Sequence, residues 1–128
     1  MKNILFFTLL LSIASCTKSH EHEGKTAPTI SISSPTEGQE FISGAAILIK
    51  GTAADDAGLH EGTIVIVKSG DNAELFRKEP SVHDLLTYAI DYTFTPIVTT
   101  ATDMKIIATF YDHDDNKTEK VINLKVKP

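Results

Sequence analysis

Apolar and polar residues alternate along most of the chain after residue 28, and this period of two most limits how the chain can fold. The alternation is clearest in residues 88–95 and recurs in residues 104–110 and 122–126. Because successive side chains of a β-strand point to opposite faces, this period predicts strands that bury one face. Tyr88 and Tyr92 share the parity of Ile90, so we expect both rings to pack in the core.

Further predicted strands occupy residues 29–34, 46–54, 63–68 and 73–78. Pro, Gly, Asp and Asn separate the strands and favour turns, so we expect turns at residues 35–38, 55–58 and 69–72. Residues 81–86 could form one helical turn. No other segment after residue 15 has the spacing of an amphipathic helix. Seven short strands predict an all-β fold: a seven-stranded antiparallel β-sandwich, immunoglobulin-like in topology, over residues 29–128. An open barrel is the alternative.

The composition excludes several classes of protein. A length of 128 residues fits one domain, and a net charge of −5 offers no basic surface for nucleic acid. The chain has one cysteine and no tryptophan, so it cannot be an antibody-type domain with an internal disulfide and a core tryptophan. No G-x-S-x-G sequence is present. We therefore expect a protein without catalytic activity.

The N-terminal sequence is typical of an export signal. Lys2 precedes an apolar run at residues 4–14. Eleven helical residues span about 16 Å, which is too short for a bilayer core of about 30 Å but is typical of a secretory signal peptide. The polar residues 17–28 lack hydrophobic periodicity and predict a flexible tether.

The sequence at the end of this run, Ile13-Ala14-Ser15-Cys16, resembles the lipobox of bacterial lipoproteins. The resemblance implies that residues 1–15 are removed and that Cys16 is lipidated and becomes the mature N-terminus, which attaches the protein to a membrane. Residues 16–28 then form the lipidated cysteine and its tether. Thr17 follows the cysteine, which by resemblance to lipoprotein sorting rules favours the outer membrane, on its periplasmic or cell-surface face. The alternative is an ordinary signal peptide with an incidental cysteine.

Two stretches of the remaining chain resemble bacterial immunoglobulin-like or cadherin-like modules. They are APTISISSPTEGQEFISGAAILIKGTAADDAGL and IIATFYDHDDNKTEKVINLKV. The likeness covers nearly the whole mature chain and is strongest to small Gram-negative lipoproteins that carry a single such domain. It implies a fold much more than a function.

In immunoglobulin-like topology, the loops after the second, fourth and sixth predicted strands lie at one end of the sandwich. These loops hold Asp55-Asp56 with His60 nearby, His83-Asp84, and the segment 112–116. Carboxylates gathered in this way repel each other unless they are solvated or neutralised by a cation. The candidate metal ligands are therefore Asp55, Asp56, His83, Asp112, His113, Asp114 and Asn116.

Three interpretations of this loop end remain open. The oxygen-bearing side chains of Asp112, Asp114 and Asn116 are spaced like the ligands at positions 1, 3 and 5 of a calcium-binding loop. Lys117, however, replaces the glycine that such a loop requires at its sixth position. Histidine ligands favour zinc or another transition metal. Alternatively, Asp and Asn serve only to form turns.

Two smaller features complete the candidates. The tether sequence His20-Glu21-His22-Glu23 could capture metal weakly or act only as a soluble spacer. Tyr111 lies on the outward parity of its strand and could stack on a sugar. The favoured function is a lipid-anchored envelope module that binds a protein or glycan partner. The alternative is an envelope lipoprotein that binds calcium or zinc.

Overall fold

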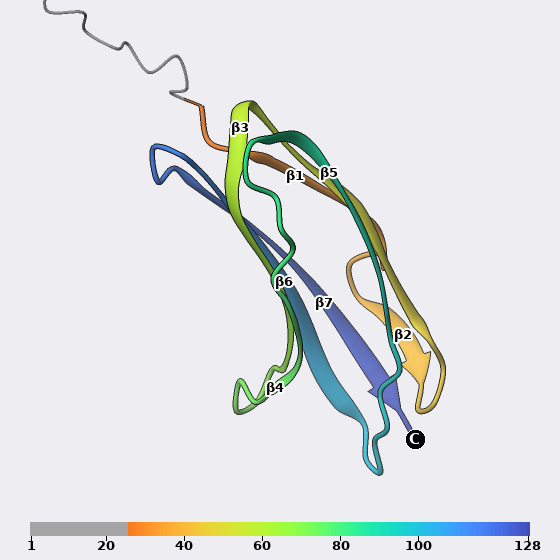
Figure 1. Cartoon of the computed structure of the whole chain (residues 1–128). Coiled ribbons are helices and arrows are strands. Elements are labelled where there is room, and N and C mark those ends of the chain that lie inside the picture. The colour runs from red at the N-terminus through yellow and green to blue at the C-terminus, as the bar shows by residue number, and fades with distance from the viewer. Residues whose placement is uncertain (1–25) are drawn as a thin grey trace, which may run out of the picture.

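The computed structural model describes residues 26–128, and in this part of the chain the only regular elements are seven β-strands (Figure 1). The predictions for residues 1–15, for Cys16 and for the tether up to residue 25 lie outside the described residues. No helix in the described part is long and apolar enough to cross a membrane. The strands are β1 (Thr29–Ser34), β2 (Gln39–Ile42), β3 (Ile47–Lys68), β4 (Glu74–Lys78), β5 (Leu85–Phe94), β6 (Thr102–Asp112) and β7 (Lys117–Lys127).

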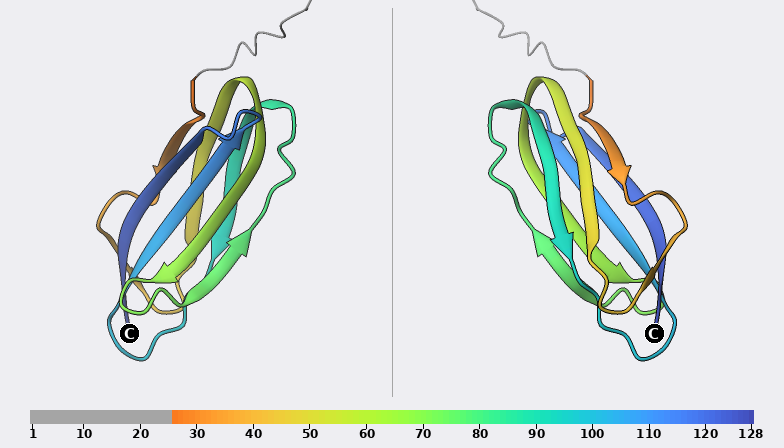
Figure 2. Two further views of the ribbon diagram at one scale, coloured as in Figure 1. Left: turned by 90° about the vertical axis from the view of Figure 1, so that its left-hand side faces the viewer. Right: turned by 90° about the vertical axis from the view of Figure 1, so that its right-hand side faces the viewer.

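The strands form two layers that share β3. The first part of β3, residues 47–54, pairs with β1 on one side and with β5 on the other. After a bend, residues 59–68 pair with β6, and residues 64–67 also pair with β4. β7 continues the second layer beside β6, and β2 closes its far edge. Figure 2 shows β3 folding over at one end, so that its two halves run in opposite directions along the two layers.

This arrangement confirms the predicted all-β, immunoglobulin-like sandwich and adds one parallel pair, β2 with β7. β2 escapes prediction because its sequence, QEFI, has no clear alternation and the strand exists through its pairing with β7. Residues 81–86 do not form a helical turn, because β5 already begins at Leu85.

The prediction that a turn at residues 55–58 separates two strands is wrong. The chain does bend here, and Gly58 has a φ of +108°. β3 nevertheless continues through the bend, because Leu59 pairs with Leu85 of β5 and also with Asp112 of β6. The hydrogen-bonded partner therefore changes within one continuous strand.

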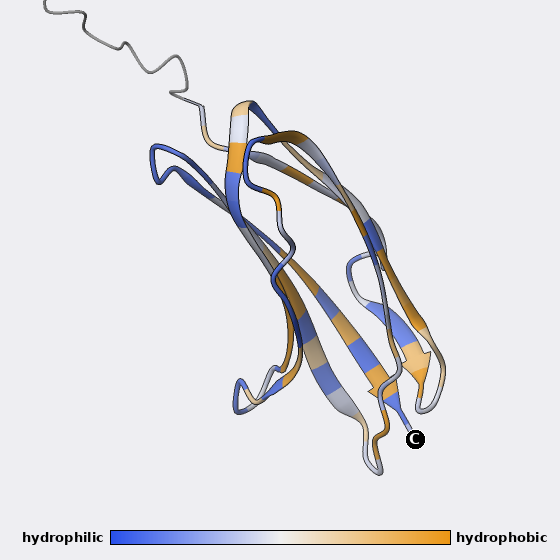
Figure 3. Ribbon diagram, in the orientation of Figure 1, coloured by the Kyte–Doolittle hydropathy of each residue, from blue (hydrophilic) through white to orange (hydrophobic). Residues whose placement is uncertain are grey.

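The alternation predicted from sequence places the core between the layers. Along β6, every second residue from Met104 to Phe110 is almost completely buried. Figure 3 shows the same alternation as bands of apolar and polar residues along β6 and β7. Tyr88 and Tyr92 are half-buried against this core, as their parity predicted, and their hydroxyl groups are 2.6 Å apart.

Candidate functional site

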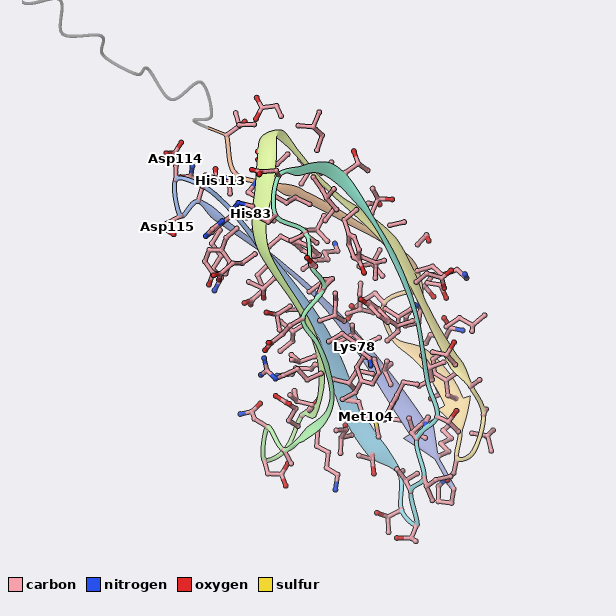
Figure 4. All side chains as sticks on the ribbon, in the orientation of Figure 1. Lys78, His83, Met104, His113, Asp114 and Asp115 are labelled. Atoms are coloured by element: carbon pink, nitrogen blue, oxygen red, sulfur yellow. The ribbon has the colours of Figure 1, made fainter. Side chains whose placement is uncertain are left out.

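Three histidines from distant parts of the chain meet at one end of the sandwich. His60 comes from β3, His83 from the β4–β5 connection and His113 from the β6–β7 hairpin. One ring nitrogen of each lies within 4.8 Å of the others. Figure 4 shows His83 and His113 beside each other at this end of the molecule. We call His60, His83 and His113 the histidine cluster.

A β-bulge positions His60. In the pairing between β3 and β6, Leu59 lies opposite Asp112 and Glu61 lies opposite Tyr111, so His60 is the extra residue. Such a bulge turns the extra side chain away from the regular alternation of the strand. At this bulge the His60 ring contacts the rings of His83 and His113, which the two connecting loops carry.

Backbone contacts with β3 hold the loop that carries His83. The Asp84 amide donates a hydrogen bond of 2.8 Å to the carbonyl of Leu59. Val82, on the other side of His83, has only 1% of its surface exposed and anchors the loop in the core. Asp84 itself has a φ of +64°, a conformation that Asp tolerates better than most residues. His83 is therefore exposed on a loop that is fixed on both sides.

The buried carboxylate of Asp112 organises the hairpin that carries His113. It accepts hydrogen bonds from the Asp114 amide at 2.8 Å, the Asn116 amide at 2.8 Å and Asn116 Nδ2 at 2.7 Å. Burial alone would raise the pKa of Asp112, but these hydrogen bonds outweigh it and hold the pKa below its ordinary value. Asp112 is thus charged at neutral pH and closes the loop around His113.

The three rings contact one another directly. His60 Nδ1 and His83 Nδ1 are 3.1 Å apart. The ring centroids are 5.1 Å apart for His60 and His83, 4.8 Å for His60 and His113, and 4.9 Å for His83 and His113. The side chains of His60 and His113 are each 37% exposed, and that of His83 is 59% exposed. An ion can therefore reach the cluster from solvent.

Carboxylates surround the histidine cluster. Asp84 Oδ1 is 3.1 Å from His113 Nε2, and Asp84 Oδ2 is 3.5 Å from His83 Nε2. Glu61 Oε1 lies 4.0 Å from His60 Nε2. Neighbouring negative charges raise the local concentration of cations at such a surface. A shallow groove of about 410 Å³ continues from His60 and His83 along Gly62 and Pro80.

The structure gives the candidate ligands predicted from sequence different surroundings. His83 and His113 lie in the cluster. Asp112 and Asn116 bond to each other within the hairpin, and the Asp114 amide joins them. These bonds use both oxygens of the Asp112 carboxylate to form the turn, which leaves a calcium ion fewer oxygen ligands.

Asp55 and Asp56 lie at the bend of β3. Asp55 Oδ1 accepts a hydrogen bond of 2.9 Å from the Ala57 amide, and Asp56 Oδ1 accepts one of 3.0 Å from the Thr26 hydroxyl. Asp55 Oδ2 is buried and has no hydrogen-bond partner among the described residues. Tyr111 is half-buried on the outward face of β6, in agreement with its parity.

Two members of the site were not among the residues selected as ligands from sequence. The sequence places His60 only near Asp55-Asp56, and Asp84 only in a loop. The bulge at His60 has no sequence signature of its own. The sequence indicates the site only in outline, because all three histidines after the tether fall in or near segments that immunoglobulin-like topology brings to one end of the sandwich.

Neither a protein-family model nor a curated protein matches the sequence. Among solved structures, the CARDB domain of a Pyrococcus furiosus protein, solved in complex with di-metal ions, is similar with a TM-score of 0.51 and 9% identity. The match covers 80% of this chain and 90% of that domain. A Niemann-Pick type C2 protein from the Japanese carpenter ant also has a TM-score of 0.51, with 17% identity over 79% of this chain and 91% of that one.

Fibronectin(III)-like modules of CbhA from Clostridium thermocellum match with a TM-score of 0.47 and 20% identity, over 77% of this chain and 96% of that module. At these identities the similarities describe the fold alone. The CARDB domain, with its TM-score of 0.51, agrees with the immunoglobulin-like sandwich that the strand pairing defines, and the function has to be argued from the histidine cluster and its surroundings.

Proposed function

We propose that this protein is a non-catalytic interaction module, held at the outer membrane by lipid on Cys16, and that the end carrying the histidine cluster is its binding surface. The observation that carries the proposal is the convergence of three distant segments on one exposed, polar end. The β-sandwich supplies the rigid scaffold, and its loops supply the variable chemistry, which is a common division of roles in such folds. The partner is an envelope protein, a glycan or an ion.

The path of the chain supports an anchored module. Residue Thr26 bonds to Asp56 at the bend of β3, so the tether enters the domain at the same end as the histidine cluster (Figure 1). Because Thr26 is already at the domain, only the nine residues 17–25 can span the distance to Cys16, which is no more than about 30 Å. The binding surface would therefore work close to the membrane, where ions and envelope components are within reach.

The histidine cluster favours a second candidate function, the binding of a metal ion. Of the two kinds of ion considered from sequence, calcium prefers oxygen ligands, whereas imidazole nitrogen favours zinc and its neighbours. The cluster offers three imidazoles, and the nearby Asp112 and Asn116 already bond to each other. Transition-metal binding is therefore better supported than calcium binding.

The anchored-module proposal is tested by labelling Gram-negative cells that express the chain with an alkyne analogue of palmitate. We expect label on the wild type, its recovery in the outer-membrane fraction, and loss of label from a Cys16→Ser variant. Absence of label from the wild type would overturn the anchor.

The binding surface is tested on glycan arrays and by crosslinking in envelope extracts. A variant with His60→Ala, His83→Ala and His113→Ala should lose the partner. The Asp103→Asn variant, changed at the opposite end of β6, should keep it. A wild type that gives no partner in either assay, and binds no ion, would contradict a binding role.

A further inference from the structure

Each histidine of the cluster has at least one ring nitrogen that faces an oxygen atom of a neighbouring residue. His113 Nδ1 lies 3.3 Å from the carbonyl oxygen of Gly58. His83 Nε2 faces Asp84 Oδ2 at 3.5 Å, and His60 Nε2 faces Glu61 Oε1 at 4.0 Å. The carboxylates near Nε2 of His60 and His83 favour a hydrogen on that nitrogen of each ring, and in His113 a hydrogen on Nδ1, beside the Gly58 carbonyl, leaves Nε2, which faces Asp84 Oδ1 at 3.1 Å, for a metal ion.

This assignment leaves one unprotonated nitrogen on each ring. They are Nδ1 of His60, Nδ1 of His83 and Nε2 of His113. Two of them, the Nδ1 atoms of His60 and His83, are 3.1 Å apart, close enough to share the hydrogen of one ring or, in its place, a cation. Backbone or carboxylate partners on the other ring nitrogen are typical of histidines that bind metal.

The spacing of the rings matches the coordination shell of a small divalent ion. Zinc binds histidine nitrogen at about 2.0–2.1 Å in a tetrahedral shell, so two ligand atoms lie about 3.3 Å apart. The pair formed by His60 and His83 already has this spacing, and ring nitrogens of all three residues lie within 4.8 Å of one another. Small rotations of these partly exposed rings would complete the shell.

The carboxylate of Asp84 lies at the edge of the same site. Its Oδ1 is 3.1 Å from His113 Nε2, the nitrogen assigned to the metal. An oxygen at this distance can balance the charge of the ion, and Asp84 Oδ2, 3.5 Å from His83 Nε2, can orient that ring. The backbone bond from Asp84 to Leu59 ties this carboxylate to the strand that carries His60.

We propose that His60, His83 and His113 bind one divalent transition-metal ion of the zinc and copper class, with Asp84 as a positioning residue. The inference rests on the proposed function only in naming the ion as the ligand of the same binding surface. Three neutral imidazoles select zinc and copper over calcium and magnesium, which require oxygen ligands. The exposed rings leave a fourth coordination position open to water.

The test is calorimetric titration of the full chain in detergent micelles with zinc chloride, copper chloride and calcium chloride. All variants carry His20→Ala and His22→Ala, so that the three histidines of the cluster are the only ones left in the chain. We expect one zinc or copper ion per chain and no heat from calcium. Nitrogen-15 spectra of the histidine rings should show zinc on Nδ1 of His60 and His83 and on Nε2 of His113.

Variants separate the ligands from the positioning residue. His83→Ala, in an exposed loop, and His113→Gln should each abolish the one-to-one binding. Asp84→Asn should weaken it about 10- to 100-fold, as the loss of a partner of a metal-binding histidine does. Asp103→Asn, at the other end of β6, should bind as the background chain does.

Three results would overturn the metal site: no zinc or copper heat from the background chain, binding that survives loss of all three histidines, or calcium binding of equal strength. The proposed function fails separately. A silent titration with palmitate label and partner capture intact removes the metal site alone. Metal binding without palmitate label removes the anchor alone.

Discussion

At the end of β6, the Asp112 carboxylate accepts three hydrogen bonds from the hairpin that follows it. The sequence favours a turn residue here over a calcium ligand, although the same Asp and Asn side chains suit either role. Here the Asp112 oxygens accept from two backbone amides and from Asn116 Nδ2, and the histidine beside them is held in place by that turn.

The Asp112→Ala change tests this role. It removes three bonds to a charged acceptor and leaves partly buried donors without a partner, so we expect a loss of about 2–4 kcal/mol in unfolding free energy. Asp112→Asn should cost less, because its side-chain oxygen still accepts from the backbone. Urea denaturation should give the same losses with and without a chelator; a loss seen only with metal present would make Asp112 a ligand.

The pKa of Tyr88 provides a test of how the side chains pack between the two layers. Burial and the hydrogen bond with Tyr92 raise the pKa of Tyr88 to about 12. This folded pKa lies above the ordinary value of about 10, so its contribution to stability is complete below pH 10 and is lost as the pH rises toward 12. The alkaline absorbance titration should therefore contain a late phenolate step.

The Tyr92→Phe variant should move that late step to lower pH, because the hydrogen bond is gone. Tyr111→Phe is the matched control, since it removes a phenolate on the outward face of β6 without touching the pair. A late step that stays in place in Tyr92→Phe, or that disappears in Tyr111→Phe, would show that the step does not come from the Tyr88–Tyr92 contact.

Gly51 lies where β1 approaches β3 most closely. A Cβ atom at this position would lie 2.2 Å from the carbonyl oxygen of Ser31, a backbone atom that cannot rotate away. Gly51→Ala should therefore cost about 1–3 kcal/mol or more in thermal or urea unfolding. Gly70→Ala meets no atom within 4 Å and should change stability by less than about 0.5 kcal/mol. Equal effects of the two changes would contradict the strand packing.

Among the elements, β2 and β3 mark the limit of what the sequence predicts. Alternation predicted the segments that became β1, β4, β5, β6 and β7 within a few residues. It predicted two strands where β3 is continuous, because the Asp and Gly residues of its bend have the composition of a turn. It missed β2, whose four residues become a strand only through contact with β7.

The edge formed by β2 and β7 depends on Glu37, which precedes β2. Its carboxylate accepts hydrogen bonds from Asn123 Nδ2 at 2.8 Å and from the Asn123 amide at 3.0 Å. The side-chain bond and then the backbone bond lower the pKa of Glu37 below its ordinary value. A carboxylate with a lowered pKa contributes stability above its ordinary pKa, and the contribution is lost as the pH falls through the folded value.

A Glu37→Gln variant should thus be less stable than the wild type at neutral pH, and the two denaturation midpoints should approach each other as the pH falls below about 4. Asp71→Asn, in the turn between β3 and β4, serves as the control for removing one negative charge. A gap between wild type and Glu37→Gln that does not change with pH would contradict a role for the ionised carboxylate.

At the scale of the whole molecule, the topology assembles the site. His60, His83 and His113 are separated by more than twenty residues in the sequence, and the strand pairing brings them to one end. The fold class was predictable because alternation repeats along the whole chain. The composition of the site was predictable only in outline, because the bulge at His60 and the placement of Asp84 depend on contacts between β3, the β4–β5 connection and the β6–β7 hairpin.

The most direct test of the three-histidine metal site is anomalous X-ray diffraction from crystals of the protein soaked in zinc or copper salt, recorded on both sides of the absorption edge of the metal. We expect one anomalous peak bounded by His60 Nδ1, His83 Nδ1 and His113 Nε2, at about 2.0–2.1 Å from each nitrogen. A crystal without a peak at this position, or with the ion held by the oxygens of the β6–β7 hairpin, would contradict this expectation.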